Sequence, residues 1–236
     1  MIVWYDHDLF FSTRKPRGIP STFGTHESWL DKLITEHGSQ IHELQQAYYD
    51  INYHQVNDQN SLLVGEKQGR ELGLINRLDN DTSGLLFFAK NPSIYLEYKR
   101  AQEQGRVTKI YYADLYGHVP HSLQVDTPIY HHAWDQTKMT INANHGRGRP
   151  HEVTTHLEPL DYDSHTKTSF CRITITKGIR HQIRVHTSSI GYHIIGDTLY
   201  CPALFRAHYS AYPGIHLRSM GLHIHDAPTS TTISKS

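Results

Sequence analysis

The chain has 236 residues, and its 23 Lys and Arg residues balance its 23 Asp and Glu residues, so its formal net charge is zero. This balance argues against a strongly basic polyanion binder, although 20 histidines make the charge adjustable below about pH 7. With 37% hydrophobic residues the composition is globular, and the length suits one domain or two small ones; we expect one catalytic domain over residues 1–236. No segment resembles a membrane span or a signal peptide, so we expect a cytoplasmic protein.

The N-terminal part predicts short strands and one helix. Two apolar patches within residues 3–13 predict a hairpin or two short strands, which lead into a turn at residues 15–18. Apolar residues on one side predict a helix over residues 27–37, ended by Gly38. The stretch 39–69 is rich in Gln, Asn and Tyr, and its weak periodicity indicates a partly helical surface excursion.

The pattern becomes sharper further along the chain. A polar cluster at residues 76–83 precedes the apolar run 85–89, which predicts a loop followed by a buried strand. A helix is expected next, with Asn91 as its N-cap, Pro92 in its first turn and Gly105 after its last turn. The loop is thus predicted to sit on a rigid base.

The second half of the chain predicts mostly strands. Residues 106–117 alternate, so that one strand face carries Val107, Lys109, Tyr111, Ala113 and Leu115. Further strands are expected at residues 153–157, 170–176 and 215–224, and a helix at about residues 181–190 before Gly191. Because strands outnumber helices and do not alternate regularly with them, we expect an α+β fold with a mixed, largely antiparallel central sheet and flanking helices and loops.

Two cysteines, Cys171 and Cys201, lie far apart and belong to no Cys-x-x-Cys motif. This spacing argues against a disulfide framework and against a thiolate zinc site. We expect both to be buried as small apolar side chains.

Three segments carry residues suited to chemistry. The polar cluster 76–84 contains Asp79, a carboxylate that could act at the edge of a cleft on a rigid base, although such clusters also form ordinary turns. In the segment 178–186, Arg180 and Arg184 are four residues apart, so on a helix beginning near His181 they would share a cationic face suited to an anion. Isolated arginines at this spacing are more often a solvated basic face. The third segment places Lys109 and Tyr111 side by side on one strand face, where such a tyrosine is usually half-buried core.

In their order and form these segments resemble the RluA-type pseudouridine synthases. The resemblance covers residues 2 to about 222 and includes Asp6 with Lys15-Pro16-x-Gly18, Asp126-x-Pro128-Ile129 with Lys138-Met139, and Gly196-Asp197-x-x-Tyr200. Its most specific parts are Arg77-Leu78-Asp79-x-x-Thr82-Ser83-Gly84, Lys109-x-Tyr111-x-Ala113 and Gly178-x-x-His181-Gln182-Ile183-Arg184-x-His186. We therefore expect the pseudouridine synthase fold.

The resemblance implies that the chain isomerises specific uridines in rRNA or tRNA to pseudouridine, without a metal, nucleotide or redox cofactor. By motif position Asp79 is the essential aspartate. Arg184 resembles the partner that favours its charged form. Tyr111 resembles the tyrosine that stacks on the target uracil.

The predicted RNA contacts follow from the same motifs. We assign RNA binding to Arg77, Lys109, Arg180, His181 and Gln182. We expect the cations Arg77, Lys109, Arg180 and Arg184 to line one cleft, together with Arg14, Lys15, Arg147 and Arg149. The histidines should make RNA affinity rise as the pH falls. We expect a monomer that uses RNA as its partner and has no membrane or metal partner.

Some positions depart from the family pattern. Many relatives have His where this chain has Asn76, and Arg or Lys where it has Ile179, and a terminal His-Pro pair is replaced by Ile224-His225. These departures concern substrate contacts more than chemistry. No small N-terminal RNA-binding domain is expected before Asp6, so RNA selection should come from the catalytic domain, through residues 39–69 and 143–150.

Two other functions compete with this interpretation. A non-catalytic RNA-binding protein on a synthase scaffold would be consistent with Asn76 and Ile179. A histidine-bound metal enzyme could use His223 and His225 with other histidines, although no His-Glu-x-x-His motif accompanies them.

Overall fold

The structure is a computed structural model that divides into two compact units, Met1–Gln104 and Gly105–Ser236. It describes residues 4–6, 9–24, 27–38, 41–42, 46, 71–206, 214–225 and 232–234. The predicted excursion at residues 39–69 therefore lies almost entirely outside the described residues.

The first unit contains three antiparallel strands. Strand β1 (Trp4–Asp6) pairs with β2 (Phe10–Lys15), and β2 pairs with β3 (Ser83–Ala89). The predicted N-terminal pair of short strands is thus confirmed. Strand β3 is buried from Gly84 to Ala89, as its continuous apolar sequence predicted.

Both predicted helices of the first unit are present, but the first begins at Trp29 rather than at residue 27. Helix α1 (Trp29–Glu36) starts with a capping box, in which Ser28 and Asp31 satisfy each other's backbone N–H groups. Helix α4 (Pro92–Glu103) starts at Asn91, whose side chain accepts a hydrogen bond from the Ile94 N–H. These caps satisfy N–H groups that a helix cannot satisfy internally.

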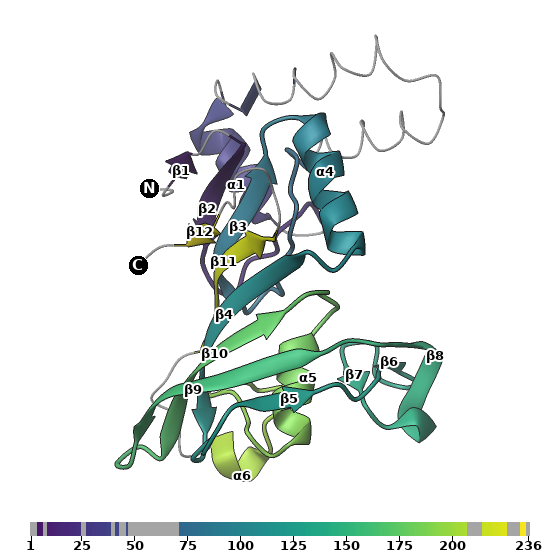
Figure 1. Ribbon diagram of the computed structural model, residues 1–236, viewed down its shortest axis with the longest axis vertical. Coiled ribbons are helices and arrows are strands. Elements are labelled where there is room, and N and C mark those ends of the chain that lie inside the picture. The colour runs from purple at the N-terminus through teal and green to yellow at the C-terminus, as the bar shows by residue number, and fades with distance from the viewer. Residues whose placement is uncertain are drawn as a thin grey trace. The chain divides into compact units, whose positions relative to one another are not determined.

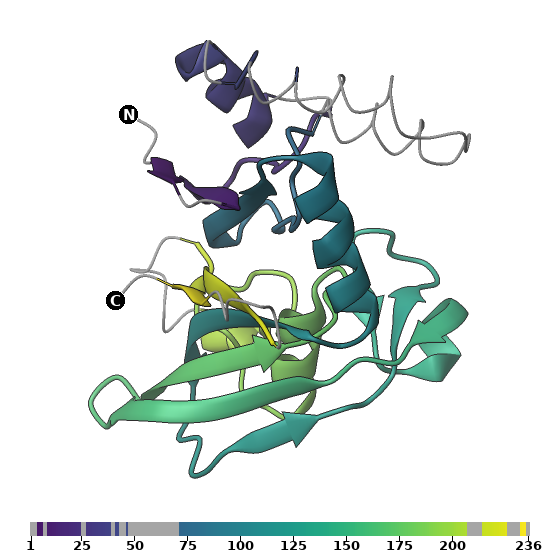
Figure 2. The same ribbon diagram turned by 45° about the horizontal axis from the view of Figure 1, so that its top comes forward.

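The second unit is built on a larger antiparallel sheet. Its long central strands are β4 (Val107–Tyr116), β9 (Thr155–Asp163), β10 (Thr168–Ile175) and β11 (Leu217–Ile224), joined by the short strands β5 (Leu123–Val125) and β12 (Thr232–Ser234). The neighbours in this unit follow the order β11, β4, β10, β9, β5, and β12 also pairs with β11. In Figure 2 the long green strands β9 and β10 lie side by side in the lower part of the view.

Strand β4 alternates as its sequence predicted. Its buried positions are Val107, Lys109, Tyr111, Ala113 and Leu115. The other positions of this strand are partly exposed. Two residues of the candidate site, Lys109 and Tyr111, therefore share the buried face.

A second, smaller sheet of the same unit was not predicted. It contains β6 (Ile129–His132), β7 (Met139–Thr140) and β8 (Gly146–His151), in the order β7, β6, β8, with a short 3-10 turn at Ala143–His145 (Figure 1). Gly146 is required here, because a Cβ at this position would lie 2.7 Å from the ring of Tyr130. The three strands are short and polar, so the sequence has no hydrophobic periodicity that would predict them.

Helix α5 (Gln182–Ser189) supports this small sheet. An apolar cluster of Ile129, Met139, Val153 and Val185 joins the sheet to the helix, and Ile179 packs against it. A short helix, α6 (Ala203–Arg206), follows later in the chain.

The predicted α+β fold with a largely antiparallel sheet is confirmed.

Both cysteines are buried and neither is in a disulfide, as expected. Burial and the nearby charge of Asp114 raise the pKa of the Cys171 thiol to about 12. Within the described residues, none of the helices combines the length and the apolar character needed to cross a membrane.

Candidate active site

The loop that carries Asp79 is held by the backbone on both sides of the carboxylate. The hydroxyl of Ser21 donates to the Leu78 carbonyl at 2.9 Å and accepts from the Leu78 N–H at 3.1 Å. On the other side, the Gly18 N–H donates to the Asn80 carbonyl at 2.8 Å. The segment 15–21 therefore fixes both neighbours of the half-buried Asp79.

Lys15 is the centre of this support. Its side chain is fully buried, and its ammonium group donates to the carbonyls of Pro16, Ile19 and Asn80 at 2.8–3.0 Å. Burial lowers the pKa of Lys15 to about 8, and the charges of Asp79 and Asp81 act in the opposite direction. The prediction that Lys15 lines a cationic cleft is wrong, because three backbone carbonyls use its three donors.

Asn76 anchors the start of the same loop to the neighbouring strand. Its side-chain amide donates to the Leu85 carbonyl and accepts from the Phe87 N–H at 2.8 Å. The Asn76 side chain is buried, so it stabilises the loop and does not contribute to the protein surface. This departure from the family pattern therefore has a structural explanation.

Replacing Lys15 by methionine is expected to lower the free energy of unfolding by about 2–4 kcal/mol, because buried carbonyls lose their donor. Urea unfolding followed by circular dichroism measures the change. The matched control is Arg14→Met, since Arg14 is the exposed neighbour on the same strand. Equal stability of the two variants would contradict the supporting role of Lys15.

In the second unit, the strand motif and the loop before α5 approach each other. Lys109 and Tyr111 are both buried on β4. A Cβ added at Gly178 would lie 3.1 Å from the Lys109 ammonium nitrogen. Because Gly178 has no side chain, it leaves room for the side chain of Lys109.

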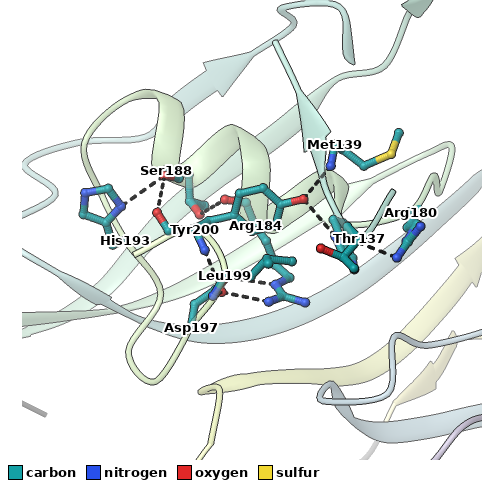
Figure 3. A network of polar contacts seen from close by, with 11 residues as sticks. Thr137, Met139, Arg180, Arg184, Ser188, His193, Asp197, Leu199 and Tyr200 are labelled. Atoms are coloured by element: carbon teal, nitrogen blue, oxygen red, sulfur yellow. Dashed lines mark hydrogen bonds and ion pairs between the residues drawn. The ribbon is translucent and has the colours of Figure 1, made fainter. Parts of the chain in front are cut away.

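Arg184 and Asp197 form a buried, bidentate ion pair (Figure 3). The Arg184 Nε and Nη2 donate to the two Asp197 oxygens at 2.8 and 2.7 Å, and the residues are 4% and 1% exposed. Burial alone would raise the pKa of Asp197, but the hydrogen bonds and charge of Arg184 outweigh it and hold the pKa below its usual value.

The turn that contains Asp197 depends on a glycine. Gly196 has φ +75°, and a Cβ there would lie 1.9 Å from the Gly214 carbonyl oxygen. In the turn, Asp197 Oδ1 also accepts the N–H groups of Leu199 and Tyr200. Asp197 thus orders the Gly196-Asp197-x-x-Tyr200 segment and orients Arg184 at the same time.

Tyr200 connects this segment to the small sheet. Its hydroxyl accepts the Met139 N–H at 2.8 Å and shares a hydrogen bond of 2.8 Å with His181 Nδ1. Its ring lies 5.3 Å from the guanidinium carbon of Arg184, a cation–π distance. Burial raises the pKa of Tyr200 to about 12, so its hydroxyl stays protonated at neutral pH.

Arg180 and Arg184 do not share one exposed helix face. Helix α5 begins after His181, which has φ +56°, so Arg180 precedes the helix. The exposed Arg180 donates to the carbonyls of Gln136 and Thr137 at 2.8 and 3.2 Å, whereas Arg184 is buried (Figure 3). The expected pair of surface cations is therefore wrong, because the left-handed residue ends the helical repeat between them.

Two other side chains of this motif, Gln182 and His186, are also buried. Gln182 Nε2 donates to the Thr154 carbonyl and to the Thr155 hydroxyl, which ties α5 to the start of β9. His186 bonds the Thr155 hydroxyl and the Thr127 carbonyl through its two ring nitrogens. These side chains fix the helix that carries Arg184.

Acidification is expected to destabilise the protein through His181. Burial, followed by the charges of Arg184 and Arg180, lowers the pKa of His181 to about 3. The unfolded chain therefore binds a proton below about pH 6.5 that the folded chain does not bind until about pH 3. The contribution of His181 to the free energy of unfolding is therefore complete above about pH 6.5. It is lost as the pH falls toward about 3, by at most about 1.4 kcal/mol per pH unit.

Urea unfolding at about pH 7 and about pH 5 measures this effect. The variant His181→Asn, which tolerates a left-handed backbone, should lose less stability on acidification than the wild type. An equal loss in both proteins would contradict the assignment to His181.

Asp197 and Tyr200 belong to the residues that carry the family resemblance, but no role was predicted for them. Their signal was the Gly196-Asp197-x-x-Tyr200 spacing, in which a turn glycine precedes a carboxylate. The cations expected to line one cleft differ in exposure. Arg14, Arg77, Arg147, Arg149 and Arg180 are exposed, while Lys109 and Arg184 are buried. Their common cleft stays a prediction.

The structure does not favour the histidine-metal alternative. In the part of the chain that the structure describes, no group of three or more His, Cys, Asp or Glu side chains is placed to hold a metal ion. The rings of His223 and His225 are 4.4 Å apart. His225 Nε2 is hydrogen-bonded to the Thr108 hydroxyl at 2.8 Å.

Comparison with known sequences adds a family. A model of the RNA pseudouridylate synthases matches residues 10–189. The chain is similar to an uncharacterized RNA pseudouridine synthase of Chloroflexus aurantiacus, with 35% identity over 64% of this chain and 45% of that protein. It is also similar to a ribosomal large subunit pseudouridine synthase D of Yersinia pestis, with 36% identity over 54% of this chain and 37% of that protein. The chain thus spans less than half the length of these two relatives.

A longer match and a structural likeness agree with these results. The dual-specificity RNA pseudouridine synthase RluA of Vibrio vulnificus is 29% identical over 83% of this chain and 67% of that protein. The structure of human RNA pseudouridylate synthase domain containing 1 is similar in fold, with a TM-score of 0.68 and 20% identity, over 100% of this chain and 83% of that one.

Proposed function

Because the chain belongs to the RNA pseudouridylate synthase family, and to its RluA type, we propose that it isomerises specific uridines in RNA to pseudouridine. One observation carries this proposal. The family match over residues 10–189 includes all three chemical motifs, at residues 77–84, 109–113 and 178–186. The order and spacing of those motifs resemble those of the RluA-type synthases and support this proposal.

The proposed reaction moves a bond without transferring electrons to another molecule. The C1′–N1 bond of the uridine breaks, the uracil turns, and C5 is joined to C1′. The hydrogen on C5 leaves as a proton, and N1 gains a proton. Asp79 is the proposed catalytic carboxylate, and the backbone bonds to Leu78 and Asn80 hold its loop in one position.

Tyr111 and Arg184 are the other proposed catalytic residues. Tyr111 offers a ring for the target uracil, which must first leave any helical stack. Arg184 supplies a cation whose orientation is fixed by Asp197. Their assignment to one reaction with Asp79 comes from the family motifs.

The proposed partner is an rRNA or a tRNA. Two of the matched relatives are named for the ribosomal large subunit and for dual specificity. Among the predicted RNA contacts, Arg77 and Arg180 are exposed and are the proposed phosphate contacts. Lys109, His181 and Gln182 are buried, and we assign them to the support of the site.

A non-catalytic RNA-binding protein is the competing function. This alternative was suggested by the departures from the family pattern at Asn76 and Ile179. Both departures have structural explanations, because Asn76 is hydrogen-bonded in the loop before β3 and Ile179 packs against the apolar cluster beside α5.

The single catalytic domain, the monomeric state and the cytoplasmic location stay predictions.

Release of tritium from RNA tests the proposal. RNA that contains uridine labelled with tritium at C5 loses the label to water when C5 is joined to C1′. The purified full chain should release tritium from transcripts of the rRNA or tRNA of its own cell. Binding of these transcripts without release from any of them would favour the non-catalytic alternative.

A further inference from the structure

The hydroxyl of Thr82 is a polar group that the first unit buries without pairing it. Thr82 is 2% exposed, and among the described residues its Oγ1 has no hydrogen-bond partner. A hydroxyl in this position has given up its hydrogen bonds to water and has gained none in the protein, which costs stability. Buried polar groups in folded proteins are nearly always hydrogen-bonded, so the exception at Thr82 calls for an explanation.

Neighbouring polar groups of the same loop are paired. The ammonium group of Lys15 donates to three backbone carbonyls, so it has no N–H left for another acceptor. The backbone N–H and carbonyl of Leu78 both bond the hydroxyl of Ser21. Both ends of the Asn76 amide bond the backbone of β3. The unpaired hydroxyl of Thr82 is therefore not the result of a loosely held loop.

A tight turn places Thr82 next to Asp79. The Thr82 N–H donates to the Asp79 carbonyl at 3.1 Å, which closes a turn of four residues directly before β3. The first and last Cα atoms of such a turn are less than about 7 Å apart, so side-chain rotation can bring the hydroxyl to the carboxylate. Asp79 is half-buried and can meet a substrate, whereas Thr82 is buried. Thr82 is thus placed to act on Asp79 and not on the RNA.

We propose that Thr82 is a positioning residue, whose hydroxyl donates a hydrogen bond to the Asp79 carboxylate when that carboxylate turns toward the ribose of the target uridine. The inference rests on the proposed function, because it takes Asp79 as the catalytic carboxylate. Hydrogen bonds to a charged carboxylate are stronger than those between neutral groups. A bond that is absent in the resting protein and forms during the reaction lowers the barrier, and a bond already present would not do so.

Thr82→Val in the full chain tests this proposal, because valine keeps the branched shape of the side chain and removes the hydroxyl. The melting temperature should stay the same or rise by up to about 4 °C, since no hydrogen bond of the resting protein is lost. In tritium release from C5-labelled RNA, kcat should fall roughly tenfold to a hundredfold, and KM should stay near the wild-type value. A purely structural threonine would not combine lower activity with equal or higher stability.

Two further variants serve as matched controls. Thr82→Ser keeps the hydroxyl, so its folded fraction should keep a kcat near that of the wild type. Thr13→Val makes the same substitution at a fully buried threonine of the same unit, whose Oγ1 accepts the Trp29 indole N–H at 2.8 Å. Because that N–H loses its partner, Thr13→Val should lower the melting temperature and leave the kcat of the folded fraction unchanged.

Several results would overturn the proposal. A wild-type kcat in Thr82→Val would show that the reaction does not use the hydroxyl. A melting temperature of Thr82→Val as low as that of Thr13→Val would show that the hydroxyl has a structural partner. If Thr82→Ser is as slow as Thr82→Val, the hydroxyl is not the group that matters. An effect of Thr82→Val on KM alone would assign the residue to RNA binding and not to the carboxylate.

Failure of the proposed function is distinguishable from failure of this inference. If the wild type releases no tritium from any RNA, the proposed function is wrong and the role of Thr82 falls with it. If the wild type releases tritium and Thr82→Val does so with the same kcat, only the inference about Thr82 is wrong, and the proposed role of Asp79 stands.

Discussion

Replacement of Asp79 by asparagine should lower tritium release from C5-labelled RNA at least about a thousandfold, while RNA binding stays near that of the wild type. Asparagine keeps the size of the side chain and removes the charge that the proposed chemistry needs. The loop should keep its shape, because Ser21, Gly18 and Lys15 bond to the backbone of Leu78 and Asn80 rather than to the carboxylate. The loss should therefore affect kcat and leave the melting temperature nearly unchanged.

Asp81→Asn is the matched control for this variant. Asp81 is an exposed carboxylate of the same loop, and it contributes a similar charge near Lys15. If Asp81→Asn retains activity and Asp79→Asn does not, the effect belongs to one carboxylate and not to the charge of the loop. More than about a tenth of wild-type activity in Asp79→Asn would contradict the assignment.

Replacement of Asp197 by alanine is expected to have the largest effect on stability, about 3–5 kcal/mol. The substitution leaves the Arg184 guanidinium, which is 4% exposed, without the carboxylate that it contacts twice. It also removes the acceptor of the Leu199 and Tyr200 N–H groups. Urea unfolding measures the stability, and tritium release measures the activity of the folded fraction.

A double-mutant cycle shows whether the cost comes from the unpaired charge. Arg184→Met/Asp197→Ala should be more stable than the sum of the two single substitutions predicts, because neither partner is then left alone. Asp197→Asn should keep the turn and lose part of the orientation of Arg184, so its kcat should fall more than its affinity for RNA. Additive effects in the cycle would contradict the account of a coupled buried pair.

The sequence predicted those elements whose pattern is local. Strand β4 alternates over ten residues, so its buried face could be assigned in advance, Lys109 and Tyr111 included. Helix α4 has a capping Asn91 and a proline in its first turn, which are signals that act within one turn of helix. The motif loop was also predicted, because its polar residues directly precede the continuous apolar strand β3.

The sequence could not predict contacts that depend on tertiary structure. Lys15 was expected to line a cationic cleft, because nothing in the sequence indicates that three carbonyls converge on its ammonium group. The pairing of Arg184 with Asp197 depends on a turn that Gly196 closes against Gly214. The small sheet was missed because its strands are rich in His, Arg and Gly and have no apolar period.

Mapping of pseudouridines in cells tests the central claim most directly. Total RNA is compared between cells with the protein, cells without it, and cells that carry only the Asp79→Asn variant. The account predicts that at least one pseudouridine in rRNA or tRNA is lost without the protein, returns with the wild type and does not return with Asp79→Asn. An identical set of pseudouridines in all three cell lines would contradict it.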